Sequence, residues 1–127
     1  MSLATILIVD DDEVLGGILR QVLLRQGYQV CLAAGAAQAL ELMQSHRPQL
    51  ALLDLCLPDG DGLQLAGDLR ALSPDLVLIL MTAYPLRLRE RPELAQEFAQ
   101  VLTKPLDLAE LRQVISERIN QVLSPGV

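Results

Sequence analysis

The sequence predicts an α/β fold in which helices cover both faces of a parallel five-stranded sheet. Five short, almost continuous apolar runs alternate along the chain with segments whose apolar residues recur at helical spacing. Polar residues do not alternate with apolar ones inside these runs, which is typical of strands buried on both faces. Strict alternation of such strands with helices implies right-handed crossovers and a doubly wound sheet.

The strands and the first helix follow directly from the apolar pattern. The apolar runs place the strands at Thr5–Val9, Gln29–Ala33, Leu50–Leu53, Leu76–Met81 and Val101–Thr103. The first helix is predicted from a stripe with i, i+3, i+4, i+7 spacing that contains Val14, Leu15, Ile18, Leu19, Val22 and Leu23. We expect this helix to stop at Gly27, because glycine readily adopts the left-handed conformation that ends helices.

The other helices are predicted from shorter patterns and from their end signals. The second helix is predicted over Ala36–Gln44 and the third over Leu63–Leu72. Two prolines bracket an Arg- and Glu-rich stretch, so the fourth helix is restricted to Pro92–Phe98. The last helix opens with Asp107 and Glu110 at the spacing of a capping box. It carries the apolar residues Leu108, Leu111, Val114, Ile115, Ile119 and Val122.

Length and charge fit one domain that binds neither nucleic acid nor a membrane. The 127 residues are 51% hydrophobic and 20% charged, which predicts a single domain over residues 1–127. Its core is expected at residues 4–123, with 124–127 as a tail or the start of a linker. A net charge of -6 and only three aromatic side chains argue against direct binding of nucleic acid or of an anionic membrane.

The start of the chain and the cysteines predict a cytoplasmic location. The first apolar run, Leu3–Val9, has no cationic flank and continues into acidic residues, so it resembles neither a signal peptide nor a membrane span. Cys31 and Cys56 belong to no CxxC motif or Cys/His cluster. We therefore expect them to be reduced, structural thiols.

Polar side chains follow four of the five predicted strands. Asp10 and Asp11 follow the first strand, Asp54 the third, Thr82 the fourth and Lys104 the fifth. The flavodoxin-like strand order 2-1-3-4-5 brings these four ends to one rim, where ligands bind in doubly wound sheets. Neighbouring strands lie about 4.8 Å apart, so a side chain as short as threonine on the fourth strand can reach a group attached to Asp54 on the third. The fifth strand lies about 10 Å from the third, so a residue there needs a side chain as long as lysine to reach the same group.

The charges at this rim predict a magnesium site and phosphoryl transfer. Two carboxylates about 4 Å apart repel each other by about 4 kcal/mol at an effective dielectric constant of about 20. A proton or a cation must therefore compensate the three acids, and an all-oxygen cluster is the environment that Mg²⁺ prefers. A carboxylate nucleophile beside a metal ion, a hydroxyl and an ammonium suits phosphoryl transfer to an aspartate.

Four motifs in this chain together resemble the receiver (response regulator) domain of two-component signalling. They are Ile6-Leu7-Ile8-Val9-Asp10-Asp11, Leu52-Leu53-Asp54-Leu55-Cys56-Leu57-Pro58-Asp59-Gly60-Asp61-Gly62, Met81-Thr82-Ala83 and Thr103-Lys104-Pro105. The resemblance covers essentially the whole chain. It implies that Asp54 accepts a phosphoryl group from a sensor histidine kinase or a phosphotransfer protein. It also implies a switch that catalyses its own phosphorylation and dephosphorylation without being a turnover enzyme.

The resemblance also implies a role for each residue at the rim. Mg²⁺ would be bound by Asp10, Asp11 and Asp54 and by the backbone carbonyl of Cys56, with Asp11 as a more direct ligand than Asp10. Thr82 and Lys104 would contact the phosphoryl oxygens, and the Lys104-Pro105 bond would be cis. Phosphorylation would rearrange the face made by the fourth helix, the fifth strand and the fifth helix, which serves an output domain in a longer chain or a homodimer.

Three further positions concern how phosphorylation is read out and how long the phosphate lasts. Receivers usually carry an aromatic switch residue three positions before the lysine, and here that position is Val101. Phe98 is the nearest aromatic residue that could take its place. Tyr84, two residues after Thr82, lies where family members tune the lifetime of the phosphate. We expect its ring to restrict the attacking water and to slow hydrolysis.

Two other functions fit parts of the pattern. The segment Asp10–Val14, with Thr82 and Lys104, resembles the motifs of haloacid dehalogenase-type phosphatases, in which Asp10 would be the nucleophile. The short chain and the lack of a paired acidic motif after Lys104 argue against that interpretation. The second alternative, a receiver-like interaction module with an altered read-out, rests only on Val101.

Some acidic residues have a structural interpretation. Asp12 precedes the first predicted helix and is assigned to cap its N-terminus. The run Asp59-Gly60-Asp61-Gly62 is interpreted as a turn, because its twelfth position is arginine and not the glutamate of a calcium loop.

Overall fold

The sheet positions every other part of the molecule. The computed structural model describes residues 4–123, so residues 1–3 and the predicted tail at 124–127 lie outside the described residues. Its five parallel strands are β1 (Thr5–Val9), β2 (Gln29–Ala33), β3 (Leu50–Asp54), β6 (Val77–Thr82) and β7 (Gln100–Thr103). They lie in the order β2-β1-β3-β6-β7. This is the predicted flavodoxin-like order 2-1-3-4-5, so the predicted fold class is confirmed.

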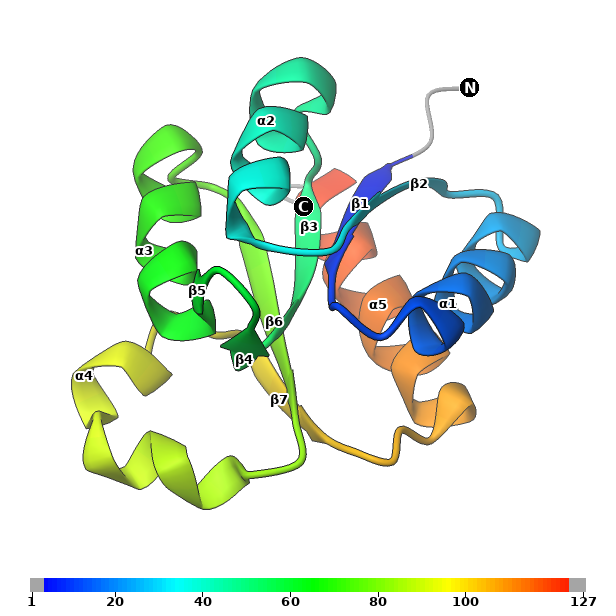
Figure 1. Ribbon diagram of the computed structural model, residues 1–127. Coiled ribbons are helices and arrows are strands. Elements are labelled where there is room, and N and C mark those ends of the chain that lie inside the picture. Colours follow the sequence, from blue (N-terminus) through cyan, green and yellow to red (C-terminus); the bar gives the residue numbers. More distant parts are fainter. Residues whose placement is uncertain (1–3, 124–127) are drawn as a thin grey trace.

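Helices cover both faces of this sheet (Figure 1). They are α1 (Glu13–Arg25), α2 (Ala36–His46), α3 (Gly62–Leu72), α4 (Pro92–Ala95) and α5 (Leu108–Leu123), with a 3₁₀ helix η1 at Pro85–Glu90. Figure 1 shows α2 and α3 on one face and α1 and α5 on the other. Among residues 4–123, none of the helices has the length and apolar character needed to cross a membrane.

The core consists of two apolar layers, one on each face of the sheet. Alternate side chains of β1 point to opposite faces, so Leu7 and Val9 join the layer under α2 and α3. Ile6 and Ile8 join the layer under α1 and α5. All four are almost completely buried. The central strands are therefore fixed from both sides, which gives the groups at their carboxyl ends a rigid base.

The predicted ends of the first and last helices are confirmed. The Asp12 carboxylate caps α1 by accepting a hydrogen bond from the amide of Leu15 at 3.0 Å. Gly27 follows α1 with a φ of 95°, the left-handed conformation expected of it. At α5, one carboxylate oxygen of Asp107 accepts from the amides of Ala109 and Glu110 at 2.9 and 3.2 Å.

The prediction for the fourth helix is wrong in extent. A helix was expected over Pro92–Phe98, but α4 ends at Ala95 and is preceded by η1. The helix ends early because the amide of Ala99 donates to the carbonyl of Leu78 at 2.8 Å, so the chain is already hydrogen-bonded to β6 at that point. Phe98 is buried in the same apolar layer as Leu88.

The segment after β3 forms a small hairpin, of which only the turn was predicted. Its strands are β4 (Cys56–Leu57) and β5 (Gly60–Asp61), and they pair antiparallel. At the base of the hairpin, the amide of Gly62 donates to the carbonyl of Leu55 at 2.8 Å. A side chain at Gly62 would collide with the backbone carbonyl of Asp54, so glycine is required for this close approach.

Candidate functional site

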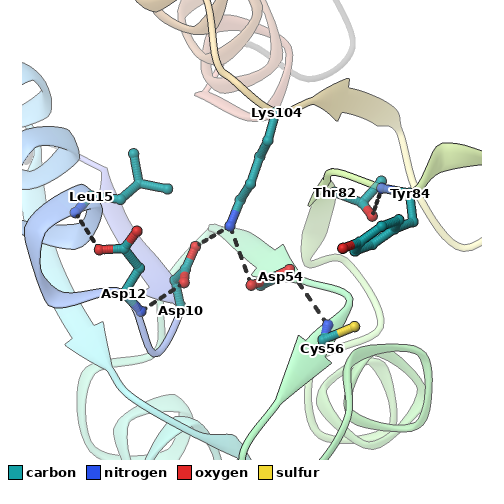
Figure 2. A network of polar contacts seen from close by, with 8 residues as sticks. All are labelled: Asp10, Asp12, Leu15, Asp54, Cys56, Thr82, Tyr84 and Lys104. Atoms are coloured by element: carbon teal, nitrogen blue, oxygen red, sulfur yellow. Dashed lines mark hydrogen bonds and ion pairs between the residues drawn. The ribbon is translucent and has the colours of Figure 1, made fainter.

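The side chain of Lys104 connects the ends of three strands (Figure 2). Its ammonium lies 2.7 Å from Asp10 Oδ2 and 3.2 Å from Asp54 Oδ2. The backbone amide of Lys104 donates to the carbonyl of Thr82 at 2.8 Å, which continues the pairing of β7 with β6. The lysine thus spans from β7 past β6 to β3, as predicted from the strand spacing, and it also reaches Asp10 at the end of β1. The predicted cis bond between Lys104 and Pro105 is also confirmed.

Three acidic side chains gather beside this ammonium. Oxygen atoms of Asp10, Asp11 and Asp54 all lie within 4.8 Å of one another. Asp10 is buried, Asp54 is half-buried and Asp11 is exposed, so the cluster opens to solvent on one side. The other oxygen of Asp10 accepts from the amide of Asp12 at 2.9 Å, which fixes the orientation of that carboxylate. This all-oxygen donor set fits a small, hard divalent cation such as Mg²⁺.

Burial and charge shift the pKa of two groups in the cluster. Burial raises the pKa of the Asp54 carboxyl; the Lys104 charge opposes this, the Asp10 charge adds to it, and the pKa stays above its ordinary value. Burial lowers the pKa of the Lys104 ammonium, but its hydrogen bonds and charge interactions with Asp10 and Asp54 outweigh burial and raise it. Lys104 is therefore protonated at neutral pH, and it compensates the Asp54 charge only in part.

The other rim residues surround Asp54 on the side away from Asp10 (Figure 2). Thr82 is buried at the end of β6, and its hydroxyl accepts from the amide of Tyr84 at 2.9 Å. The Tyr84 side chain is 61% exposed. The amide of Cys56 donates to Asp54 Oδ1 over a long 3.4 Å, and the Cys56 side chain is exposed. The predicted residues Asp10, Asp11, Asp54, Thr82 and Lys104 thus meet at one rim.

Val101 and Phe98, the two candidate switch residues, lie elsewhere in the core. Phe98 is buried in the layer under α2 and α3, and Val101 is half-buried at the edge of the same layer. Val101 also borders a surface pocket of about 220 Å³ that is lined by Leu106 and Glu110 as well. A role of either residue in switching stays a prediction.

A family model described as the response regulator receiver domain matches residues 6–116. The chain belongs to this family. Receivers are signalling domains of two-component systems that interact with histidine kinases or phosphotransfer proteins. The phosphatase and the altered interaction module considered above are not favoured by this result.

Two curated relatives illustrate the contexts in which such a domain occurs. The chain is 34% identical over 117 residues to sporulation initiation phosphotransferase F of Bacillus subtilis, covering 88% of this chain and 90% of that protein. It is 31% identical over 126 residues to the DNA-binding transcriptional regulator NtrC of Azospirillum brasilense, covering 99% of this chain. Only 26% of that regulator is spanned, so the remainder of NtrC has no counterpart in the match.

Solved receiver structures share the fold. A CheY-like receiver domain protein from Methanospirillum hungatei is 32% identical with a TM-score of 0.88, covering 94% of this chain and 96% of that one. The response regulator TrrA of Thermotoga maritima, solved in complex with Mg²⁺-BeF, is 28% identical with a TM-score of 0.79. That match covers 91% of this chain and 98% of the TrrA chain.

Replacing Asp54 by asparagine should stabilise the protein at neutral pH in the absence of divalent cations. The pKa of Asp54 is raised in the folded state. Ionisation of this carboxyl therefore lowers the free energy of unfolding once the pH exceeds about 3.9, the pKa that an aspartate has in the unfolded chain. The amide that replaces the carboxylate carries no such charge. We expect a higher free energy of unfolding in urea for Asp54→Asn at pH 7, with a gain that shrinks as the pH falls.

The control is Asp68→Asn on α3, where an exposed carboxylate accepts from the side-chain amide of Gln64. This variant should leave stability almost unchanged. A loss of stability in Asp54→Asn at pH 7 would contradict the description of the site.

Proposed function

We propose that Asp54 is the phosphoacceptor of this receiver, and that its donor is a sensor histidine kinase or a phosphotransfer protein. The observation that carries the proposal is the position of Lys104, whose ammonium is 3.2 Å from Asp54 and 2.7 Å from Asp10. A single ammonium that reaches past a neighbouring strand to the acid at the end of β3 suits a group that must bind phosphoryl oxygens. Membership of the receiver family supports the same assignment.

Mg²⁺ is the cofactor that fits the acids around Asp54. Asp10, Asp11 and Asp54 would hold the ion with their carboxylates, and Cys56 with its backbone carbonyl. Bound there, Mg²⁺ supplies positive charge that offsets both the carboxylates and the incoming phosphoryl oxygens. The close grouping of the three carboxylates supports this ligand set. So does the similar TrrA receiver, which was solved with Mg²⁺-BeF.

The transfer step needs little from the protein beyond positioning and charge. A carboxylate oxygen of Asp54 forms a bond to phosphorus while the bond from phosphorus to the donor atom breaks, and the electron pair of that bond leaves with the donor. The Lys104 ammonium and the Thr82 hydroxyl donate hydrogen bonds to phosphoryl oxygens as negative charge develops on them. Since these groups belong to the chain itself, a small phosphodonor is sufficient, and the domain catalyses its own phosphorylation and dephosphorylation.

The read-out is proposed to use the face formed by α4, β7 and α5. An output domain in a longer chain, or a second copy of the chain, would bind there after phosphorylation. Val101 is not aromatic and cannot take the role of the usual aromatic switch residue, so other residues of this face would have to transmit the signal. Residues 4–123 form the core of the single receiver domain in this proposal, and its location is cytoplasmic.

Incubation with acetyl phosphate and Mg²⁺ tests the assignment of the phosphoacceptor. The parent should be labelled on the peptide that contains Asp54, and Asp54→Asn should not be labelled at all. Lys104→Ala should be labelled about 100-fold more slowly, because it loses one donor to the developing phosphoryl charge. Asp10→Asn should be labelled slowly but still on Asp54. Labelling that survives in Asp54→Asn and disappears only in Asp10→Asn would assign the nucleophile to Asp10 and refute the proposal.

Tyr84 is proposed to prolong the life of the phosphorylated state. Its backbone amide donates to the Thr82 hydroxyl at 2.9 Å, while its exposed ring points toward Asp54 in Figure 2. A ring in this position restricts the water that attacks the phosphoryl group. Phosphate release measured after removal of the phosphodonor should be severalfold faster in Tyr84→Ala and little changed in Tyr84→Phe. Equal decay rates in the parent and Tyr84→Ala would rule out this role.

A further inference from the structure

A carboxylate from the β4–β5 hairpin caps helix α2, which is distant in sequence. The residue at the N-cap position of α2 is Gly35, which has no side chain with which to cap it. Instead, Asp59 Oδ1 accepts from the amide of Ala36 at 2.6 Å, and Asp59 Oδ2 accepts from the amide of Ala37 at 3.1 Å. Both oxygens of one carboxylate are thus used to join the turn of the hairpin to the start of α2.

Glycine is required at position 35 because of this contact, and not because of the backbone conformation there. Its φ of -162° and ψ of -177° are extended values that any residue adopts. A Cβ at this position would lie 2.5 Å from Asp59 Oδ1, and the three heavy atoms nearest to it all belong to the Asp59 side chain. The glycine therefore makes room for the carboxylate, and the two residues form a matched pair.

The hairpin is held at its other end as well, close to Asp54. The amide of Gly62 donates to the carbonyl of Leu55, and the Asp61 carboxylate caps α3 by accepting from the amide of Leu63 at 2.8 Å. Cys56 pairs with Asp61 and lies between the two points of attachment. The hydrogen bonds from the amides of Ala36 and Ala37 lower the pKa of Asp59, so its carboxylate is charged at neutral pH and holds α2 strongly.

We propose that Asp59 is a positioning residue for the metal site, because it fixes the β4–β5 hairpin and thereby the backbone carbonyl of Cys56. The inference rests on the proposed function, in which that carbonyl is a ligand of Mg²⁺. A ligand on a short hairpin is in place only if both ends of the hairpin are held. Asp59 provides the attachment at the end remote from Asp54, so its loss lets the carbonyl move and weakens the binding of the ion. Residues that orient metal ligands commonly change affinity without touching the metal.

The first test compares Mg²⁺ affinity in Asp59 variants by calorimetric titration. We expect the Kd for Mg²⁺ to rise about 10-fold in Asp59→Ala, as is typical when the support of a ligand is removed. Asp59→Asn retains one acceptor oxygen and should be intermediate. Asp68→Ala removes the same charge from an exposed site on α3 and should retain the parent affinity. The change in Asp59→Ala should persist at about 0.5 M salt, where the long-range effect of a lost surface charge is screened.

The second test substitutes Gly35, the residue that makes room for the Asp59 carboxylate, and changes no charge. Gly35→Ala places a methyl group against Asp59 and should also weaken Mg²⁺ binding. Once Asp59 is already alanine, the three heavy atoms nearest to that methyl group are gone. The double variant should therefore bind Mg²⁺ about as well as Asp59→Ala alone, and the effects of the two substitutions should not add.

The outcomes separate a positioning role from a merely structural one. If Asp59→Ala and Gly35→Ala lower the melting temperature but leave the Kd for Mg²⁺ at the parent value, Asp59 is only a helix cap and the inference is wrong. Additive effects in the double variant would contradict it too. If the parent itself neither binds Mg²⁺ nor becomes phosphorylated on Asp54, the proposed function has failed, which is a different result from equal affinities in parent and variants.

Discussion

Repulsion among three carboxylates at one end of the sheet is the constraint on which the rest of the site depends. Oxygen atoms of Asp10, Asp11 and Asp54 lie within 4.8 Å of one another, where each charged pair costs about 3 to 4 kcal/mol at an effective dielectric constant of about 20. Lys104 brings only one positive charge to this cluster. Burial and, to a smaller extent, the Asp10 charge keep the pKa of Asp54 raised in spite of Lys104. The fold thus holds a charge imbalance that a divalent cation would relieve.

The sheet and the loops contribute different properties to the site. Asp54 and Thr82 end strands that are paired on both sides and buried between two apolar layers, so their positions change little. Cys56 and Tyr84 lie on connections between the strands and helices, where a few hydrogen bonds decide the geometry. In the function proposed above, the phosphoacceptor is therefore fixed by the architecture of the sheet, whereas the affinity for the ion and the lifetime of the phosphate are assigned to loop residues, which vary without changing the fold.

Most of the fold and the central part of the site could be predicted from the sequence, because buried strands leave continuous apolar runs and side chains at strand ends converge. The reach of Lys104 followed from the strand spacing together with the flavodoxin-like strand order. The end of α4 could not be predicted, because a hydrogen bond to Leu78 ends it and no local signal marks that contact. The strands of the hairpin are only two residues long, too short for a recognisable pattern. The link from Asp59 to α2 joins residues 22 and 23 positions apart and appears only in three dimensions.

The most direct test is a titration of the Asp54 carboxyl, followed at its carboxyl carbon by NMR with and without Mg²⁺. We expect a pKa above the ordinary aspartate value in the absence of the ion, because burial and Asp10 outweigh Lys104. We also expect Mg²⁺ to lower this pKa markedly, since the ion favours the charged carboxylate. An Asp54 pKa at or below the ordinary value without Mg²⁺, or one that Mg²⁺ leaves unchanged, would show that these acids do not form a charge-imbalanced magnesium site.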